Sequence, residues 1–365
     1  MKPIDPLYRA VLGQCERWAD LDERAWDDLV EGAGREGLEG LLYQGALAAE
    51  ADMPAGVREH LGTIYRETAV HNVVALQTAG EVLERASGAG LQALVMPGAA
   101  LLPHYPDLGC RPMDDVDILV RPGRLYEMRD FLRTQGFSSP PRHPDLWERR
   151  GVVFDLHEDL LNCSRIGARR YAGWLDVREV WRDSREHIVE GLSLTTMGRE
   201  DALLYTAVHA LRHSFRRMTW FFDLYFLLCA TDWSLVREKA QRYCVQRPLV
   251  YGLRFLREHL QLELPDCTRA WMEGTTVRWG EEYLLQRAWQ DRLEREWGDL
   301  LWSFNIPDVS QRCRFLIETF FPSPSVLLQV FPYLPRVLFP LAYALRIGQL
   351  TLKGGKHMAG LVWRG

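Results

Sequence analysis

Residues 94–120, LVMPGAALLPHYPDLGCRPMDDVDILV, decide the fold of this chain. The stretch opens within a largely apolar run, residues 91–96, whose length and composition are typical of a buried strand. Pro97 and Gly98 end that strand, and a helix is expected near residues 98–105. A glycine at such a junction lets the backbone turn sharply and lets a ligand approach closely. The free amides and positive dipole end of a helix starting there would favour a phosphate group.

An acidic segment, DDVDILV, follows at residues 114–120. If it is a strand, Asp115 and Asp117 point to one face, because strand side chains repeat every two residues. Two adjacent carboxylates repel each other unless a cation lies between them. A hard divalent ion such as Mg²⁺ binds one or two carboxylates together with the phosphates of its substrate. The pattern therefore indicates metal-dependent phosphoryl or nucleotidyl chemistry, and a solvated acidic turn is the alternative.

Several motifs along the chain resemble those of a known family. They are Gly98, YPDLG at 105–109, RPMDDVDILV at 111–120, FDLH at 154–157, and the segment 201–223 with His209, His213, Trp220 and Asp223. Together they resemble the bacterial uncharacterised nucleotidyltransferase family, within the polymerase-β-like nucleotidyltransferase superfamily. The Arg-Pro-Met-x-Asp-x-Asp block is the specific part, since a bare Asp-x-Asp is a weak signal.

The resemblance implies a nucleotidyltransferase that uses Mg²⁺ or Mn²⁺ and moves NMP from an NTP to a hydroxyl, releasing pyrophosphate. Asp115, Asp117 and Asp155 would be the catalytic residues and would hold the metal. Glu158 and Asp159 are alternatives to Asp155. Other residues would contact the nucleotide or acceptor: Gly98, Ala99, Arg111, His157, His209 and His213. The sequence identifies neither the acceptor nor the preferred NTP, and a small molecule, a sugar or a protein side chain is expected as acceptor.

Two departures from the family pattern leave an alternative function open. The family usually has Lys-Gly at the turn, where this chain has Pro97, Gly98 and Ala99. Asp114 stands where the family usually has glycine. The alternative is therefore a nucleotide-binding or scaffold protein on the same fold, with weakened catalysis and a place at the membrane surface.

Two of the candidate residues also have structural interpretations. Arg111 could place its guanidinium on a triphosphate, or it could brace the loop by pairing with Asp107 or Asp114. His157 shares the strand face of Asp155, so it could orient an acceptor or a metal ligand. It could equally be a hydrogen-bonded structural histidine.

The histidines of segment 201–223 lie four residues apart, hence on one face of an expected helix. The glutamate of a His-Glu-x-x-His zinc motif is absent after His209, so the spacing does not favour zinc. His209 and His213 are expected to line the nucleotide or acceptor pocket, or to bond to Asp223 within the core. Trp220 and Phe221 are expected in the core.

Composition fits an ordinary globular protein of 365 residues with a net charge of −5. No basic, aromatic-interleaved stripe is present, so long nucleic acid is not an expected partner. The seven cysteines are scattered without a Cys-x-x-Cys pair, which argues against a disulfide framework. With no apolar run of signal-peptide length at the N-terminus, the chain is predicted to be cytoplasmic.

The order of the predicted elements indicates an α+β fold, a small mixed sheet flanked by helices at both ends. The predicted units are an N-terminal helical region (1–90), a nucleotidyltransferase core (91–196), a C-terminal helical domain (197–318) and a basic apolar tail (319–365). Strands are expected at 91–96, 116–120, 152–157 and 192–196. Helices are expected at 57–86, 98–105 and 122–135, in an apolar-periodic run at 203–228, and near 234–262 and 278–304. Residues 32–37 are expected to separate two N-terminal helical segments.

The tail, residues 319–365, contains no acidic residue and five basic ones: Arg336, Arg346, Lys353, Lys356 and Arg364. Its prolines and Arg336 interrupt the apolar runs, so a transmembrane helix is not predicted. Packing on the helical domain is the first expectation for this segment. Peripheral contact with the inner face of a membrane is the second, because cations beside apolar side chains suit anionic lipid. The oligomeric state is not predicted.

Overall fold

The computed structural model describes residues 5–12, 18–140, 143–228, 231–290, 295–330 and 335–344. It contains a six-stranded mixed sheet. The strand order is β3-β4-β2-β1-β6-β5. The strands are β1 (Ala93–Val95), β2 (Val116–Val120), β3 (Leu146–Arg149), β4 (Val152–His157), β5 (Arg185–Val189) and β6 (Leu192–Thr196). β2 runs parallel to β4 and β1 runs parallel to β6, whereas the other neighbouring pairs are antiparallel.

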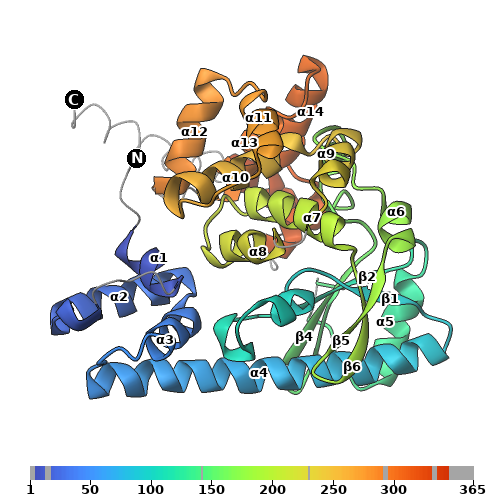
Figure 1. The fold of residues 1–365 in the computed structure, drawn as a ribbon. Helices are drawn as coiled ribbons and strands as arrows, with labels where there is room; N and C mark the ends of the chain where they lie inside the picture. Colours follow the sequence, from blue (N-terminus) through green and yellow to red (C-terminus); the bar gives the residue numbers. More distant parts are fainter. Residues whose placement is uncertain are drawn as a thin grey trace.

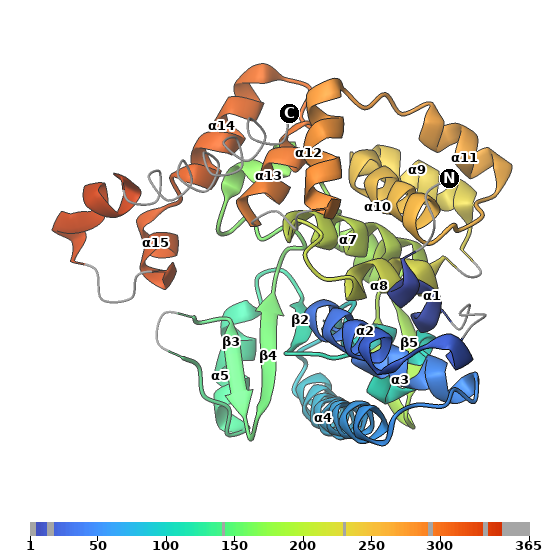
Figure 2. The same ribbon diagram turned by 90° about the vertical axis from the view of Figure 1, so that its left-hand side faces the viewer.

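One face of the sheet is covered by the long helix α4 (Ala55–Gly88) and by α5 (Leu125–Thr134), as Figure 2 shows. The strands alternate buried and half-buried residues, and Phe154 and Leu156 of β4 pack in the same apolar cluster as Leu76 of α4 and Met128 of α5. Gly80 of α4 lies so close to β6 that an added Cβ would approach Leu192 to 3.1 Å. The polar residues of β2 and β4 therefore face away from this cluster.

Helices from both ends of the chain form a second, larger core above the sheet (Figure 1). The N-terminal ones are α1 (Pro6–Val11), α2 (Glu23–Glu36) and α3 (Glu39–Ala48). The C-terminal ones are α7 (Arg199–Arg212), α8 (Thr219–Leu227), α9 (Trp233–Arg242), α10 (Gln246–His259), α11 (Asp266–Glu273), α12 (Trp279–Gln290), α13 (Arg295–Ser303) and α14 (Val309–Phe320). The last helix, α15 (Pro324–Val330), projects from the helical body in Figure 2. A short helix, α6 (Val177–Arg182), precedes β5. Buried side chains from both groups, among them Trp26, Phe222 and Trp302, belong to this one cluster.

The predicted α+β fold with a small mixed sheet and flanking helices is confirmed. The four predicted strands are β1, β2, β4 and β6, and the predicted long helix is α4. β3 and β5 were not predicted, because edge strands carry charged, exposed side chains that hide the apolar alternation. A helix that was also not predicted, α11, lies between the two C-terminal segments expected near 234–262 and 278–304.

Three helix predictions need correction. The expected helix at 98–105 is a 3₁₀ helix, η2 (Ala99–His104), in which Pro103 cannot donate a backbone hydrogen bond. α2 continues through residues 32–36 and ends only at Gly37, which takes the left-handed conformation with φ +69°. The apolar run 203–228 is two helices, α7 and α8, separated by residues 213–218.

Candidate active site

The pairing of β2 with β4 brings two carboxylates together at one face of the sheet. Asp117 and Asp155 are partners in the parallel register of these strands. Asp115 lies just before β2. The amide of Met96 donates to the carbonyl of Asp117 at 3.0 Å, so the end of β1 and the turn after it lie beside the acids. As predicted, Asp115 and Asp117 lie on one side of the sheet, where they line the same cavity as Asp155.

His157 joins this acidic pair. Its Nε2 lies 2.7 Å from Oδ1 of Asp117 and 3.5 Å from Oδ2 of Asp155. Its Nδ1 lies 3.2 Å from Oδ1 of Asn162, whose φ of +54° is left-handed. One ligand atom from each of Asp117, Asp155 and His157 falls within 4.8 Å of the others, so this group could hold a metal ion.

Burial and mutual repulsion govern the charge states of these groups. Burial raises the pKa of Asp115 to about 7, and repulsion by Asp117 and Asp155 adds to that shift. Burial raises the pKa of Asp155 to about 6, with His157 opposing the change. Burial also disfavours the charged form of Asp117, but the hydrogen bond and the charge of His157, together with smaller contributions from His209 and Arg212, keep the pKa of Asp117 below its ordinary value. Conversely, burial would lower the pKa of His157, but Asp117 raises that pKa to about 9.

The donor set fits a hard divalent cation. Carboxylate oxygens are the ligands that Mg²⁺ and Mn²⁺ prefer. Burial is the main cause of the raised pKa values of Asp115 and Asp155, and a bound cation would stabilise the charged form of both carboxylates. Asp115 is not part of the closest three-residue group, but it lines the same cavity as Asp117 and Asp155.

That cavity has a volume of about 640 Å³ and lies between the sheet and helices α7 and α8. Its lining is rich in arginine: Arg35, Arg111, Arg165, Arg212, Arg216 and Arg217. Arg212 is buried, whereas Arg216 and Arg217 are exposed at its mouth. A guanidinium suits the oxygens of a phosphate, so the cavity offers cations to an anionic ligand beside the carboxylates.

Three rings form one wall of the cavity. His209 and His213 lie 4.5 Å apart between ring centroids, and each lies within 5.4 Å of Trp220. Burial lowers the pKa of His209 to about 4, so this ring is neutral at physiological pH. Both predicted histidines line the cavity. Trp220, expected in the core, lines it too, whereas Phe221 is buried in the core as expected.

Arg111 is held by a partner that the sequence did not indicate. Its Nε and one terminal nitrogen each lie 2.8 Å from an oxygen of Asp223, and both side chains are buried. Tyr105 donates a further hydrogen bond of 2.6 Å to Asp223. Of the two expected partners, Asp107 accepts from the amide of Gly109, and Asp114 pairs with Arg217. Arg111 thus connects the loop before β2 to helix α8. It also lines the cavity, but its guanidinium is already paired with Asp223.

The predicted phosphate turn takes a conformation that only glycine adopts easily. Gly98 has φ +129° and ψ −98°. Within the described chain, no heavy atom beyond its neighbours would lie within 4 Å of an added Cβ at Gly98, so the space beside it is open. Pro97 lines the acidic cavity, whereas Ala99 is buried in the sheet core.

Sequence reasoning missed Asn162 and Arg165, which both line the cavity. They lie in the loop after β4, where no periodic pattern marks a functional side chain. Asn162 lies five residues beyond His157 in the sequence. It contacts the His157 ring only because the loop folds back onto the strand.

The sheet places paired carboxylates in a cavity that is also lined by arginines. This arrangement is typical of a protein that binds a metal ion together with a phosphorylated ligand. The chain belongs to the uncharacterised nucleotidyltransferase family, whose model matches residues 22–261. The predicted family is thereby confirmed, and membership supports a transferase that acts on nucleotides. No curated protein matches the sequence.

Among solved structures, the chain is similar to an antigenic nucleotidyltransferase-like protein from Paracoccidioides brasiliensis. The two share 13% sequence identity over 54% of this chain and 95% of that one, with a TM-score of 0.36.

Proposed function

We propose that this protein is a Mg²⁺-dependent nucleotidyltransferase. It moves NMP from an NTP to a hydroxyl group of a small molecule, sugar or protein and releases pyrophosphate. The observation that carries the proposal is the register of Asp117 with Asp155, with His157 in contact with both. Membership of the nucleotidyltransferase family supports it independently.

In this function the carboxylates of Asp115, Asp117 and Asp155 would hold the divalent cation. A bound Mg²⁺ or Mn²⁺ would stabilise charge on the phosphate oxygens and lower the pKa of the acceptor hydroxyl. The acceptor oxygen forms a bond to the α-phosphorus, and the bond from that phosphorus to the pyrophosphate oxygen breaks. Asp155 takes the proton from the acceptor hydroxyl.

The remaining side chains position the NTP. Arg212 and Arg216 line the same cavity as the acids and would pair with the triphosphate. His209, His213 and Trp220 supply aromatic faces for the nucleotide base or the acceptor. Arg111 acts indirectly, because its guanidinium is committed to Asp223. The open space at Gly98 leaves room for the phosphates to approach the turn.

A calorimetric titration of each NTP, with and without Mg²⁺ or Mn²⁺, tests the binding step. Asp117→Asn should abolish the metal-dependent part of NTP binding. Asp130→Asn is the matched control, because Asp130 lies on α5, outside this cavity, and is paired with Arg133. If Asp117→Asn binds NTP and metal as the wild type does, the proposed site is wrong.

The competing function, a nucleotide-binding protein with weakened catalysis, rests on Pro97 and Ala99 in the turn. Release of pyrophosphate from a bound NTP in the presence of a mixture of candidate acceptors separates the two. Transfer favours the enzyme. Binding without transfer, together with tighter triphosphate binding on Pro97→Lys, favours the weakened protein.

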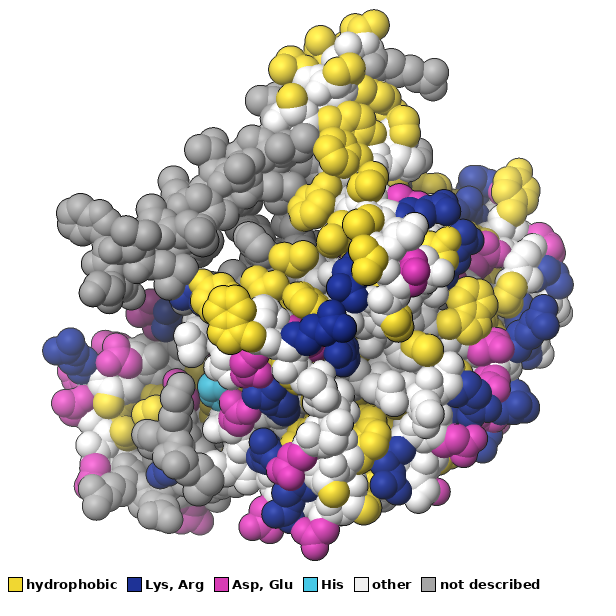
Figure 3. Space-filling view, turned by 90° about the horizontal axis from the view of Figure 1, so that it is seen from above, with side chains coloured by type: hydrophobic (Ala, Val, Ile, Leu, Met, Phe, Trp, Pro, Cys, Tyr) yellow, Lys and Arg dark blue, Asp and Glu magenta, His cyan; other side chains and the backbone are white. Residues whose placement is uncertain are grey.

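A peripheral membrane contact of the C-terminal segment is the second candidate. Several apolar side chains of this segment are exposed: Phe321, Val337, Leu338 and Leu341. In Figure 3, hydrophobic side chains gather on the part of the molecule that projects beyond the helical body. No helix among the described residues is both long and apolar enough to cross a membrane. The basic residues beyond residue 344 lie outside the described part of the chain.

We therefore propose a cytoplasmic protein that touches an anionic lipid surface through this segment. The absence of acidic residues from 319–365 supplies the charge complementarity. Flotation with vesicles of anionic or neutral lipid tests it, and Val337→Glu with Leu341→Glu should abolish recovery with the anionic vesicles. Val309→Glu, at an exposed apolar position at the start of α14, is the matched control. Equal recovery with all variants, or none with the wild type, would contradict the contact.

A further inference from the structure

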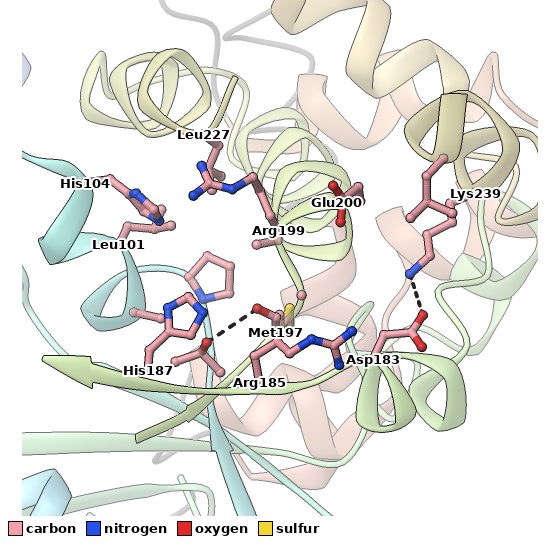
Figure 4. Close-up of a pocket in the computed structure, with 16 residues that line it drawn as sticks. Leu101, His104, Asp183, Arg185, His187, Met197, Arg199, Glu200, Leu227 and Lys239 are labelled. Carbon is pink, nitrogen blue, oxygen red and sulfur yellow. Dashed lines mark hydrogen bonds and ion pairs between the residues drawn. The ribbon is translucent and has the colours of Figure 1, made fainter. Parts of the chain in front are cut away.

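The cavity that contains the acids has a neighbour on either side. A second cavity, of about 390 Å³, lies by the β5–β6 edge of the sheet (Figure 4). Among the described residues that line it, Pro97 is the one it shares with the acidic cavity. Its lysine, Lys239, is paired at 2.8 Å with Asp183 of the same lining. This second cavity therefore does not border the proposed metal-binding acids.

A third cavity, of about 200 Å³, which we call the side pocket, lies by the opposite edge of the sheet. It is bounded by the start of α5, the residues just before β3, the end of β4 and the loop after β4. Five of its lining residues also line the acidic cavity: Leu146, Asp155, His157, Asn162 and Arg165. The two cavities therefore adjoin, and Asp155 belongs to the wall of both.

This arrangement gives the two substrates of a transfer reaction separate spaces. The arginines proposed for the triphosphate, Arg212 and Arg216, line the acidic cavity and not the side pocket. An in-line displacement needs the attacking oxygen and the leaving oxygen on opposite sides of the phosphorus. A hydroxyl group in the side pocket would approach past Asp155, the residue proposed to take its proton, without displacing the triphosphate.

The lining of the side pocket is mostly polar. Besides the shared residues, its polar members are Arg129, His143, Asp145, Glu158, Asp159 and Ser164. Among the described residues of the lining there is no phenylalanine, tyrosine or tryptophan. The side pocket thus lacks the large aromatic face on which a nucleobase would stack, which disfavours a nucleoside as acceptor.

Two half-buried carboxylates of the lining are fixed by backbone amides. Oε1 of Glu158 accepts from the amides of Gly123 and Leu125, at 2.8 and 3.3 Å. Oδ1 of Asp159 accepts from two amides of its own loop, each at 2.9 Å. Within the described chain, the second oxygen of each carboxylate accepts no hydrogen bond. That oxygen is placed to accept from the hydroxyl groups of a ligand.

The balance of charge in the side pocket disfavours an anionic ligand. Of the two arginines in the lining, Arg129 is paired with Asp145 at 2.5 Å. The rest of the lining sets Asp155, Glu158 and Asp159 against one guanidinium, that of Arg165. Carboxylates repel an anion, whereas a hydroxyl group can donate to a carboxylate and accept from a guanidinium.

We propose that the side pocket binds the acceptor, and that the acceptor is an uncharged polyhydroxylated molecule such as a sugar. The inference rests on the proposed nucleotidyl transfer and names its second substrate. Pockets for drug-sized ligands measure about 300–1,000 Å³, so the side pocket holds a group about the size of one sugar ring. One hydroxyl loses its proton to Asp155, its oxygen bonds to the α-phosphorus, and pyrophosphate leaves. Other hydroxyls donate to Glu158 and Asp159.

Saturation-transfer NMR titration with millimolar glucose, galactose and N-acetylglucosamine, without NTP or metal, tests the binding step. Ser164→Trp, at an exposed position of the lining, should fill the pocket and weaken binding at least about tenfold. Ser87→Trp, exposed in the last turn of α4, is its matched control. Glu158→Gln keeps one oxygen for the amides but loses the second acceptor, so it should weaken binding several-fold. Glu127→Gln, exposed on α5, should not.

A parallel calorimetric titration of NTP with Mg²⁺ separates this inference from the proposed function. Ser164→Trp should bind NTP as the wild type does, because Ser164 does not line the acidic cavity, but should no longer release pyrophosphate with the sugar. Wild type that binds NTP but none of these sugars would overturn the inference and leave the nucleotidyl transfer standing. Preference for glucuronate or glucose 6-phosphate over the neutral sugars would overturn it too. Absence of NTP binding would instead refute the transfer, whereas the sugar titration would still decide whether the pocket binds a polyol.

Discussion

The guanidinium of Arg111 binds both carboxylate oxygens of Asp223, each at 2.8 Å, across 112 positions of the chain. Both side chains are almost fully buried, and Tyr105 donates a hydrogen bond to the same carboxylate. This pair fixes the loop before β2 against helix α8. It thereby holds the acids of the sheet at a set position relative to His213 and Trp220 of the helical wall.

Removing one member of that pair should be costly. Arg111→Ala leaves Asp223 buried without its main partner, and the free energy of unfolding should fall by about 3–5 kcal/mol. Denaturant unfolding measures it. Arg217→Ala is the control, since the Arg217–Asp114 pair is exposed and its loss should cost less than about 1 kcal/mol. Similar losses for the two variants would mean that Arg111 does not brace the site.

The turn at Gly98 should resist substitution because of its backbone, not its surroundings. Gly98→Ala places a Cβ in open space but at φ +129°, so we expect a loss of roughly 1–3 kcal/mol in unfolding free energy. Gly56→Ala provides the comparison, since Gly56 also has open space but lies in the first turn of α4 without positive φ. That variant should be neutral or slightly stabilising. A neutral Gly98→Ala would show that the turn relaxes to another conformation.

Asn162 should act through His157. Its hydrogen bond to Nδ1 fixes the ring that contacts Asp117, and loss of such a partner typically weakens metal binding about 10-fold or more. Asn162→Gly keeps the left-handed backbone accessible while it removes the side chain, so a fall in Mn²⁺ affinity would be due to the hydrogen bond. Titration of Mn²⁺ by electron paramagnetic resonance measures it. Unchanged affinity would mean that His157 is oriented by other contacts.

Asp183 should give the fold an acid-sensitive contribution. The hydrogen bond from Arg182, followed by the interaction with Lys239, lowers the pKa of Asp183 to about 2 from an ordinary value of 3.8. A carboxyl whose pKa is lower in the folded state stabilises that state above its unfolded pKa. The stabilisation is lost as the pH falls from about 4 towards 2. The difference in Tm between wild type and Asp183→Asn should therefore be largest near neutral pH and shrink below pH 4. A difference that stays constant with pH would contradict this assignment.

Local pattern was sufficient for much of the fold. The alternation in DVDILV predicted both the strand β2 and the common face of its acids, because side-chain direction in a strand depends only on sequence position. The long helical run at 57–86 likewise became α4. The edge strand β5 was not predicted. Its residues are mostly exposed, so its sequence lacks the apolar alternation of a half-buried strand.

Arg111 and Trp220 show where local pattern fails. The sequence placed the partner of Arg111 among nearby acids, and only the packing of α8 on the loop brings Asp223 to it. Trp220 reads as a core residue, but the break between α7 and α8 turns it towards the cavity. In both cases the outcome depends on how distant elements pack, which no local periodicity encodes.

The sequence by itself determined the acidic strand, the glycine turn and the family, because each depends on a short stretch of neighbouring residues. Only the tertiary structure decided that β4 lies parallel to β2 with Asp155 opposite Asp117, and that His157 and Asn162 complete the group. It alone also brings residues as distant in sequence as Pro97 and Lys239 together around a second cavity, of about 390 Å³. The physical reason is that strand pairing and helix packing depend on the burial of the whole chain, whereas periodicity records only which face each side chain takes.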